Sequence, residues 1–203
     1  MSKAVSNFGS RTKSRVSPFK LFIAGVIFLM SNNATIANAA TPAPGAYPTA
    51  QEGFQFLEGS WRIHNRQLKQ PLSSREEWIE YQAFGRFITL LDGLVSVEEL
   101  RNAKGEPFGS AMRTFDREKR VWSDAWVSAR DGVLQLPSFG SFAGDVGTFI
   151  AEDTFDDKPV LARGIWRRVS KNHVIWEQAL SLDKGATWQT NWIMNFERTE
   201  PQP

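Results

Sequence analysis

The sequence predicts an all-β fold, an antiparallel up-and-down barrel of about nine or ten strands with a short helical turn in front of the first strand. Short runs rich in Trp, Phe, Val and Ile fill most of the chain after residue 58. Turn sequences separate these runs at intervals of about ten residues, which is typical of an antiparallel meander. The clearest turn sequences are 102–105, 116–119, 130–132, 156–159 and 183–185.

Alternation along the runs indicates which side chains face the interior. Successive residues of a strand point to opposite faces. In 188–196 the even positions are Trp188, Thr190, Trp192, Met194 and Phe196, and the odd positions are mostly polar. The same test gives inward faces of Trp122, Asp124 and Trp126, of Val160, Ala162, Gly164 and Trp166, and of Val174, Trp176, Gln178 and Leu180. Only 51–57 suggests a helical turn.

The N-terminal segment has the pattern of a secretory signal peptide. Residues 1–39 carry five basic side chains and no acidic one, and an apolar run occupies 21–30. That run is too short for a membrane-spanning helix, which needs about 20 apolar residues. Ala37-Asn38-Ala39 fits the small-x-small cleavage pattern. We expect Sec-type export, cleavage after Ala39 and a periplasmic or secreted protein with no integral membrane anchor after cleavage; the alternative is an uncleaved N-terminal anchor.

Removing this leader changes the charge of the protein. The chain has 24 basic and 22 acidic residues, so residues 40–203 keep 19 basic and 22 acidic ones, a net charge of −3. A nucleic-acid partner then has no support from composition. Because the chain has no cysteine, the fold must depend on a hydrophobic core. The expected organisation is a Pro/Ala linker at 40–50, one barrel domain at 51–199 and a tail at 200–203.

Two short patterns refine the barrel prediction. Residues 54–61 follow F-x-F-L-x-G-x-W, a turn that enters the first strand. Residues 181–188 match the Asp-box pattern S-x-D-x-G-x-T-W. The second pattern predicts a hairpin in which Asp183 accepts backbone N–H groups, Gly185 supplies a positive φ and Trp188 packs beneath. A β-propeller would repeat this pattern in each blade, whereas this chain has one copy.

The order of these patterns resembles a family of uncharacterised bacterial exported proteins of calycin-like, lipocalin fold. The opening and the single Asp-box hairpin carry the resemblance, which extends over the rest of the mature chain through 132–149, 152–155, 163–166, 176–179 and 191–196. It implies a lipocalin-like barrel in which Trp61 closes one end and Arg198 packs over Trp61. It implies no particular activity.

The sequence lacks the common catalytic and metal-binding motifs. It has no cysteine nucleophile, no G-x-S-x-G, no phosphate-binding glycine loop and no H-E-x-x-H. Parity places both histidines, His64 and His173, on the outer face. We therefore expect no metal and no cofactor, although a haem ligand is possible in principle. Nothing in the sequence indicates an oligomeric state.

The remaining candidate is a ligand site inside the barrel. All eight tryptophans follow the leader, and aromatic walls with a few polar groups are typical of small-ligand sites. The predicted partner is an apolar or amphipathic small molecule, with sugars as a second class. The alternative is a solid core with no pocket. The predicted ligand-binding residues are Trp78, Glu80, Trp122, Asp124, Trp126, Trp166, Trp176, Gln178 and Trp192.

Asp124 is the one catalytic candidate. Tryptophans two residues away on either side would desolvate its carboxylate and raise its pKa. A small barrel enzyme, an isomerase, cyclase or hydrolase, is thus the alternative to a binding protein. It would need a second group, Glu177 or Glu80. An ion pair with Arg113 or Arg163 would make Asp124 structural instead.

Overall fold

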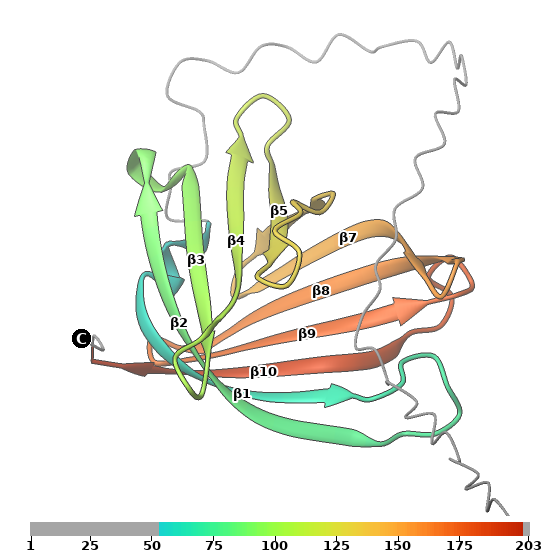
Figure 1. The fold of residues 1–203 in the computed structure, drawn as a ribbon. Coiled ribbons are helices and arrows are strands. Elements are labelled where there is room, and N and C mark those ends of the chain that lie inside the picture. Colours follow the sequence, from blue (N-terminus) through green and yellow to red (C-terminus); the bar gives the residue numbers. More distant parts are fainter. Residues whose placement is uncertain (1–52, 201–203) are drawn as a thin grey trace, which may run out of the picture.

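A computed structural model describes residues 53–200 as ten antiparallel strands closed into one barrel (Figure 1). Each strand pairs with its neighbours in the sequence, and β1 pairs with β10 to close the sheet. The predicted all-β, up-and-down barrel is confirmed. The strands are β1 (Gly59–Leu68), β2 (Trp78–Leu90), β3 (Val95–Asn102), β4 (Pro107–Asp116), β5 (Val121–Ser128), β6 (Ser138–Ala143), β7 (Val146–Phe155), β8 (Lys158–Ser170), β9 (His173–Ser181) and β10 (Gln189–Thr199).

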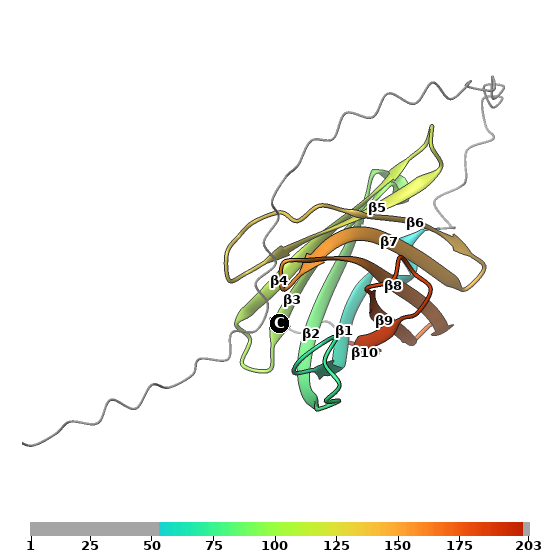
Figure 2. The same cartoon turned by 90° about the vertical axis from the view of Figure 1, so that its right-hand side faces the viewer.

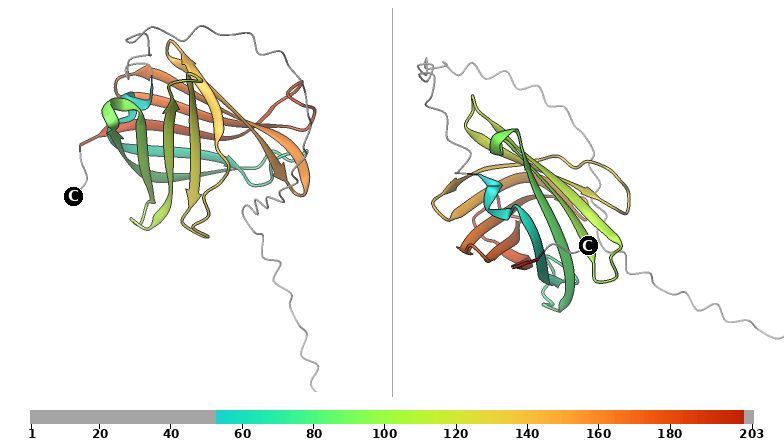
Figure 3. Two further views of the ribbon diagram at one scale, coloured as in Figure 1. Left: turned by 90° about the horizontal axis from the view of Figure 1, so that it is seen from above. Right: turned by 90° about the vertical axis from the view of Figure 1, so that its left-hand side faces the viewer.

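The barrel has two halves whose strands cross. In the view from above, β2, β3 and β4 run at a steep angle to β8, β9 and β10 (Figure 3). The side view shows β1 next to β10, where the sheet closes (Figure 2). Short 3-10 turns, η2 (Phe54–Leu57) and η3 (Leu91–Gly93), are the helical elements within residues 53–200. The predicted signal peptide and linker, and residues 201–203 of the predicted tail, lie outside the described residues.

The helical turn η2 closes one end of the barrel. Trp61 at the start of β1 donates its Nε1–H to the carbonyl of Leu57 at 2.6 Å. The Arg198 guanidinium lies 4.2 Å from the centre of the Trp61 ring and donates to the carbonyls of Phe56 (2.8 Å) and Lys171 (3.0 Å). The expected packing of Arg198 over Trp61 is therefore present, and it ties the last strand to the closing turn.

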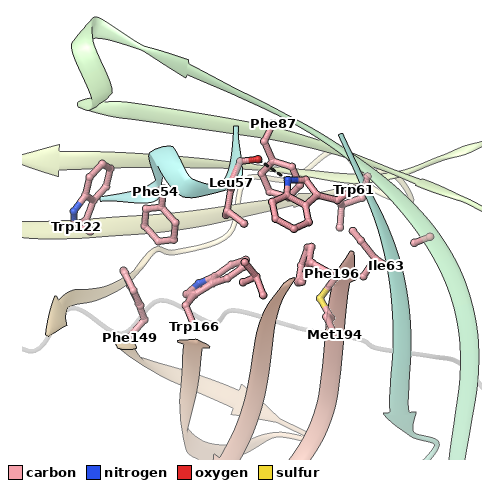
Figure 4. Packing of buried hydrophobic residues seen from close by; sticks show 13 residues of the cluster. Phe54, Leu57, Trp61, Ile63, Phe87, Trp122, Phe149, Trp166, Met194 and Phe196 are labelled. Carbon is pink, nitrogen blue, oxygen red and sulfur yellow. Dashed lines mark hydrogen bonds between the residues drawn. The ribbon is translucent and has the colours of Figure 1, made fainter. Parts of the chain in front are cut away.

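A dense apolar cluster fills the barrel beneath η2. Phe54 and Leu57 are fully buried, and their side chains project from η2 toward Trp166 and Phe149 (Figure 4). Trp61, Phe87 and Phe196 surround the same cluster. At this end the rings fill the interior, as the solid-core alternative expects.

The turn between β9 and β10 is the hairpin predicted at 181–188. Asp183 accepts hydrogen bonds from the backbone N–H of Thr187 (2.8 Å), the Thr187 hydroxyl (2.6 Å) and the Ser181 hydroxyl (2.7 Å). These donors, the Thr187 hydroxyl first, lower the pKa of Asp183 to about 2. Gly185 has φ +91°, and the Trp188 ring lies beneath it.

The predicted alternation in 188–196 is wrong at Asn191. A β-bulge between Thr190 and Trp192 adds one residue to β10, which breaks the two-residue period. Asn191 is fully buried instead of facing out, and it donates to the Gln178 amide oxygen at 3.0 Å. Trp188 lies before β10 in the hairpin, where the Arg163 guanidinium stacks 4.2 Å from its ring centre. Trp192, Met194 and Phe196 follow the prediction.

Candidate functional site

The half of the barrel away from η2 contains a cavity of about 580 Å³. Its volume lies in the range of small-molecule sites, roughly 300–1,000 Å³. Inward residues of most strands line it, because the sheet closes on itself and places alternate side chains inside. Six of the predicted residues contribute to its walls: Asp124, Trp126, Trp166, Trp176, Gln178 and Trp192.

The other three predicted residues lie elsewhere. Trp122 is 4% exposed and packs edge-on against Phe54 in the closed-end cluster, with the ring centres 5.1 Å apart. The inward placement of Trp78 and Glu80 is wrong. Both are on the outer face of β2, where Glu80 pairs with His64 and Arg66 at 3.2 Å, and Arg66 also lies over Trp78.

The reason for this error is visible in the burial of β2. Its buried residues are odd-numbered, namely Ala83, Gly85 and Phe87. The first large ring of the strand, Trp78, suggests the opposite parity. An aromatic residue at a strand end covers a neighbouring cation on the surface as readily as it enters a core. His64 is on the outer face, as parity predicted.

A buried ionic cluster forms one wall of the cavity. Arg113 of β4 donates from Nη2 to Glu98 Oε2 of β3 at 2.8 Å. Its Nε lies 3.0 Å from Asp124 Oδ2 of β5. Arg113 and Glu98 are 2% and 4% exposed, whereas 16% of the Asp124 side chain is exposed. Asp124 is thus the most accessible member of the cluster.

Two aromatic rings flank the guanidinium of Arg113. Its central carbon lies 4.8 Å from the centre of the Phe54 ring and 5.0 Å from that of Trp166. Burial acts to lower the pKa of Arg113, but the two carboxylates outweigh it and raise this pKa. Burial raises the pKa of Glu98, and Arg113 offsets only part of that rise. The cluster therefore favours the charged form of Arg113. It disfavours ionisation of Glu98 beside an ionised Asp124.

The ion pair with Arg113 is the contact that the structural alternative for Asp124 expects. Arg163 is not its partner, because Arg163 stacks on Trp188 outside the barrel. Glu177, considered as a second catalytic group, pairs with Arg167 at 2.6 Å. Asp124 is accordingly held in a buried ion pair, which is the structural alternative stated above.

Two acidic residues of the cavity were not predicted, Glu98 and Asp153. In β3, Val95 and Val97 have the opposite parity to Glu98, whereas the buried Leu100 shares it, so alternation in this strand does not decide which way Glu98 faces. Asp153 of β7 lies between Ala151 and Phe155 on the inward face, and all three line the cavity. That alternation could have indicated Asp153.

The far wall of the cavity is aromatic and amide-rich. Trp176 and Trp192 meet edge to face with their centres 5.5 Å apart. Trp192 donates its Nε1–H to the Asn65 amide oxygen at 2.9 Å. Gln178 accepts from Asn191, so its side chain is fixed at the cavity surface. Trp176 and Trp192 thus present indole rings to the cavity.

The described part of the chain holds no group of three His, Cys, Asp or Glu side chains suited to a metal ion. No helix in residues 53–200 is long and apolar enough to cross a membrane. Aromatic walls and one buried ionic cluster are the main features of the site. Comparison with models of protein families and with curated protein sequences finds no match for this chain, so its function is inferred from the cavity itself.

Proposed function

We propose that this chain is an exported protein that binds one small apolar or amphipathic molecule inside its barrel, with sugars as a second ligand class. The observation that carries the proposal is the cavity of about 580 Å³, which joins an aromatic wall to a charged one. Most small-ligand sites are concave and apolar with a few fixed polar groups. Here the fixed polar groups are Gln178 and the Arg113–Asp124 pair.

The two walls suggest how an amphipathic ligand lies. Trp126, Trp176 and Trp192 offer flat apolar area for its body. Asp124 offers a partly exposed carboxylate for its polar end. In this orientation the apolar body of the ligand contacts the apolar wall. The polar end of the ligand keeps a hydrogen-bonding partner, so it is not buried unpaired.

A binding role is favoured over the enzyme alternative. General acid–base catalysis needs a group that reaches the substrate and can exchange its proton. Glu98 has a raised pKa but is only 4% exposed and hydrogen-bonded to Arg113. Asp124 reaches the cavity but is committed to Arg113. Neither of these two carboxyl groups combines access with freedom from the ion pair. Asp153 lines the cavity without an ion pair, but among residues 53–200 no hydrogen bond joins it to a second acid–base group, which this catalysis needs.

Export is the first part of the proposal to test. The intact mass of the protein from the cell envelope or medium is expected to be that of residues 40–203. Ala39→Leu should block cleavage and leave the leader attached, because signal peptidase needs a small residue there. Ala34→Leu, outside the small-x-small pattern, is the control and should be cleaved normally. A wild-type protein that keeps residues 1–39 in the exported fraction would contradict the prediction.

Ligand binding is tested by filling the cavity. Ala151 lines it, whereas Ile150, one residue away, points outward and is 37% exposed. Titration with the neutral fluorescent probe N-phenylnaphthylamine is expected to saturate at one molecule per barrel. Ala151→Trp should weaken binding at least about tenfold, because the indole takes the ligand's space. Ile150→Trp adds the same ring outside and should leave the affinity unchanged. Equal losses in both variants would place the probe elsewhere.

A further inference from the structure

We propose that the cavity selects a positively charged ligand, an ammonium group on an apolar body, over a carboxylate of the same size. This inference rests on the proposed binding function and names the ligand class of the same cavity. It depends on which charges of the cavity are already paired and which are not.

Arg113 is not available to an anionic ligand. Its Nη2 donates to Glu98, its Nε faces Asp124, and the rings of Phe54 and Trp166 flank its faces. Its Nη1 has no hydrogen-bond partner among residues 53–200, but this atom is buried and out of a ligand's reach. Only 2% of the residue is exposed. A ligand carboxylate would have to displace Asp124 and would then leave that carboxylate buried without its partner, which is unfavourable. The cation in the wall therefore does not make the cavity a site for acids.

Asp153 is a second carboxylate at the cavity, and it has no counter-ion. Its Oδ1 accepts the backbone N–H of Thr154 at 2.7 Å. Among residues 53–200 no basic side chain forms an ion pair with it. Burial raises its pKa. A bound cation near Asp153 would compensate its negative charge, whereas a bound anion would add to the repulsion.

The charges of the lining are unequal in number. Glu98, Asp124 and Asp153 are acidic, and Arg113 is the one basic group deep in the wall among the described lining residues. Arg130, on the loop after β5, also lines the cavity, but its side chain is 52% exposed and contacts Asp131 at 3.4 Å. Its charge is thus at the solvent-exposed rim. The interior carries an excess of negative charge.

The aromatic wall supports the same preference. Phe108 lies 6.0 Å from Trp126 and 6.3 Å from Trp192, centre to centre, so the three rings form a continuous surface. Ring faces attract cations, and the attraction is larger where water is excluded. The barrel uses this contact for its own guanidinium groups at Trp61, Trp166 and Trp188. A ligand ammonium would meet both ring faces and a carboxylate.

The test compares three probes with the same decyl chain: decyltrimethylammonium, decanol and decanoate. Each is titrated against N-phenylnaphthylamine bound to the mature protein, purified from the exported fraction, at low salt. The ammonium is expected to bind at least about tenfold more tightly than decanoate, with decanol between them. Asp153→Asn should reduce this ratio at least about threefold. Asp145→Asn is the control, since its side chain is 76% exposed and pairs with Arg168 outside the cavity; it should leave the ratio unchanged.

The outcomes separate the two proposals. If the three probes bind with equal affinity, or decanoate binds best, the cation preference is wrong and the binding function stands. If the ratio falls equally in the Asp153 and Asp145 variants, the preference comes from overall charge and not from the cavity, which also overturns the inference. If N-phenylnaphthylamine and the three decyl probes all fail to bind, the binding function itself fails.

Discussion

Arg113→Met is expected to lower the free energy of unfolding by about 3–5 kcal/mol at neutral pH, the usual cost of removing one partner from a buried ionic group. Arg113 is the shared counter-ion of Glu98 and Asp124. Methionine keeps the aliphatic part of the side chain but not the guanidinium that lies over the rings of Phe54 and Trp166, so the loss reports the ion pairs together with these cation–π contacts. Urea unfolding followed by tryptophan fluorescence measures it.

A matched variant on the surface separates the effect of burial from that of charge. Arg62 pairs with Glu197 at 2.8 Å, but the two side chains are 53% and 62% exposed. Arg62→Met is expected to cost about 0–1 kcal/mol, because water screens an exposed ion pair. Adding Glu98→Gln to Arg113→Met should recover part of the stability. If Arg113→Met costs no more than Arg62→Met, the ionic cluster does not stabilise the barrel.

The cost of Arg113→Met should also depend on pH. Burial raises the pKa of Glu98 in the folded protein above its unfolded value. Protonated Glu98 therefore stabilises the folded state. This contribution is complete below the pKa that Glu98 has in the unfolded protein, and it is lost as the pH rises through the higher pKa of the folded protein. Without Arg113 this folded pKa rises further. The loss should be smaller at about pH 5 than at about pH 7.5; a loss independent of pH would contradict this account of Glu98.

The fold could be predicted because its signals are local. Turn sequences recur at the strand spacing, and Trp61 with Arg198 marks the closed end. The parity of β5, β8 and β9 follows from their own tryptophans, since a ring in the middle of a strand enters the core. In these strands the prediction places Asp124, Trp166 and Trp176 correctly at the cavity.

The errors occur where a single residue does not show which face of its strand is buried. Trp78 stands at the first position of β2 and covers a surface arginine. The bulge at Asn191 shifts parity within a strand, and neither Gly nor Pro marks it. Glu98 is buried because Arg113 of the next strand neutralises it. The register between two strands decides which residues become partners. The alternation within one strand carries no information about that register.

Whether the barrel is hollow depends on the volume that η2 fills. Phe54 brings a ring into the interior that no strand supplies, and it packs against Trp122, Phe142, Phe149 and Trp166 with ring centres 5.0–5.7 Å apart. The closed end is solid for this reason, while the other half remains open as the cavity. The sequence shows enough rings to fill a barrel but not their distribution between the two ends.

Phe54→Ala is therefore expected to destabilise the protein by about 3–5 kcal/mol, the range for truncating a buried phenylalanine. It removes the ring under Arg113 as well as the contacts of Phe54 with five neighbouring aromatic rings. Thermal and urea unfolding measure the loss. Phe139→Ala is the control, because Phe139 is 54% exposed on β6, and it should cost less than about 1 kcal/mol. If the two variants are equally stable, η2 does not hold the closed end, and the division into a solid half and a hollow half has another cause.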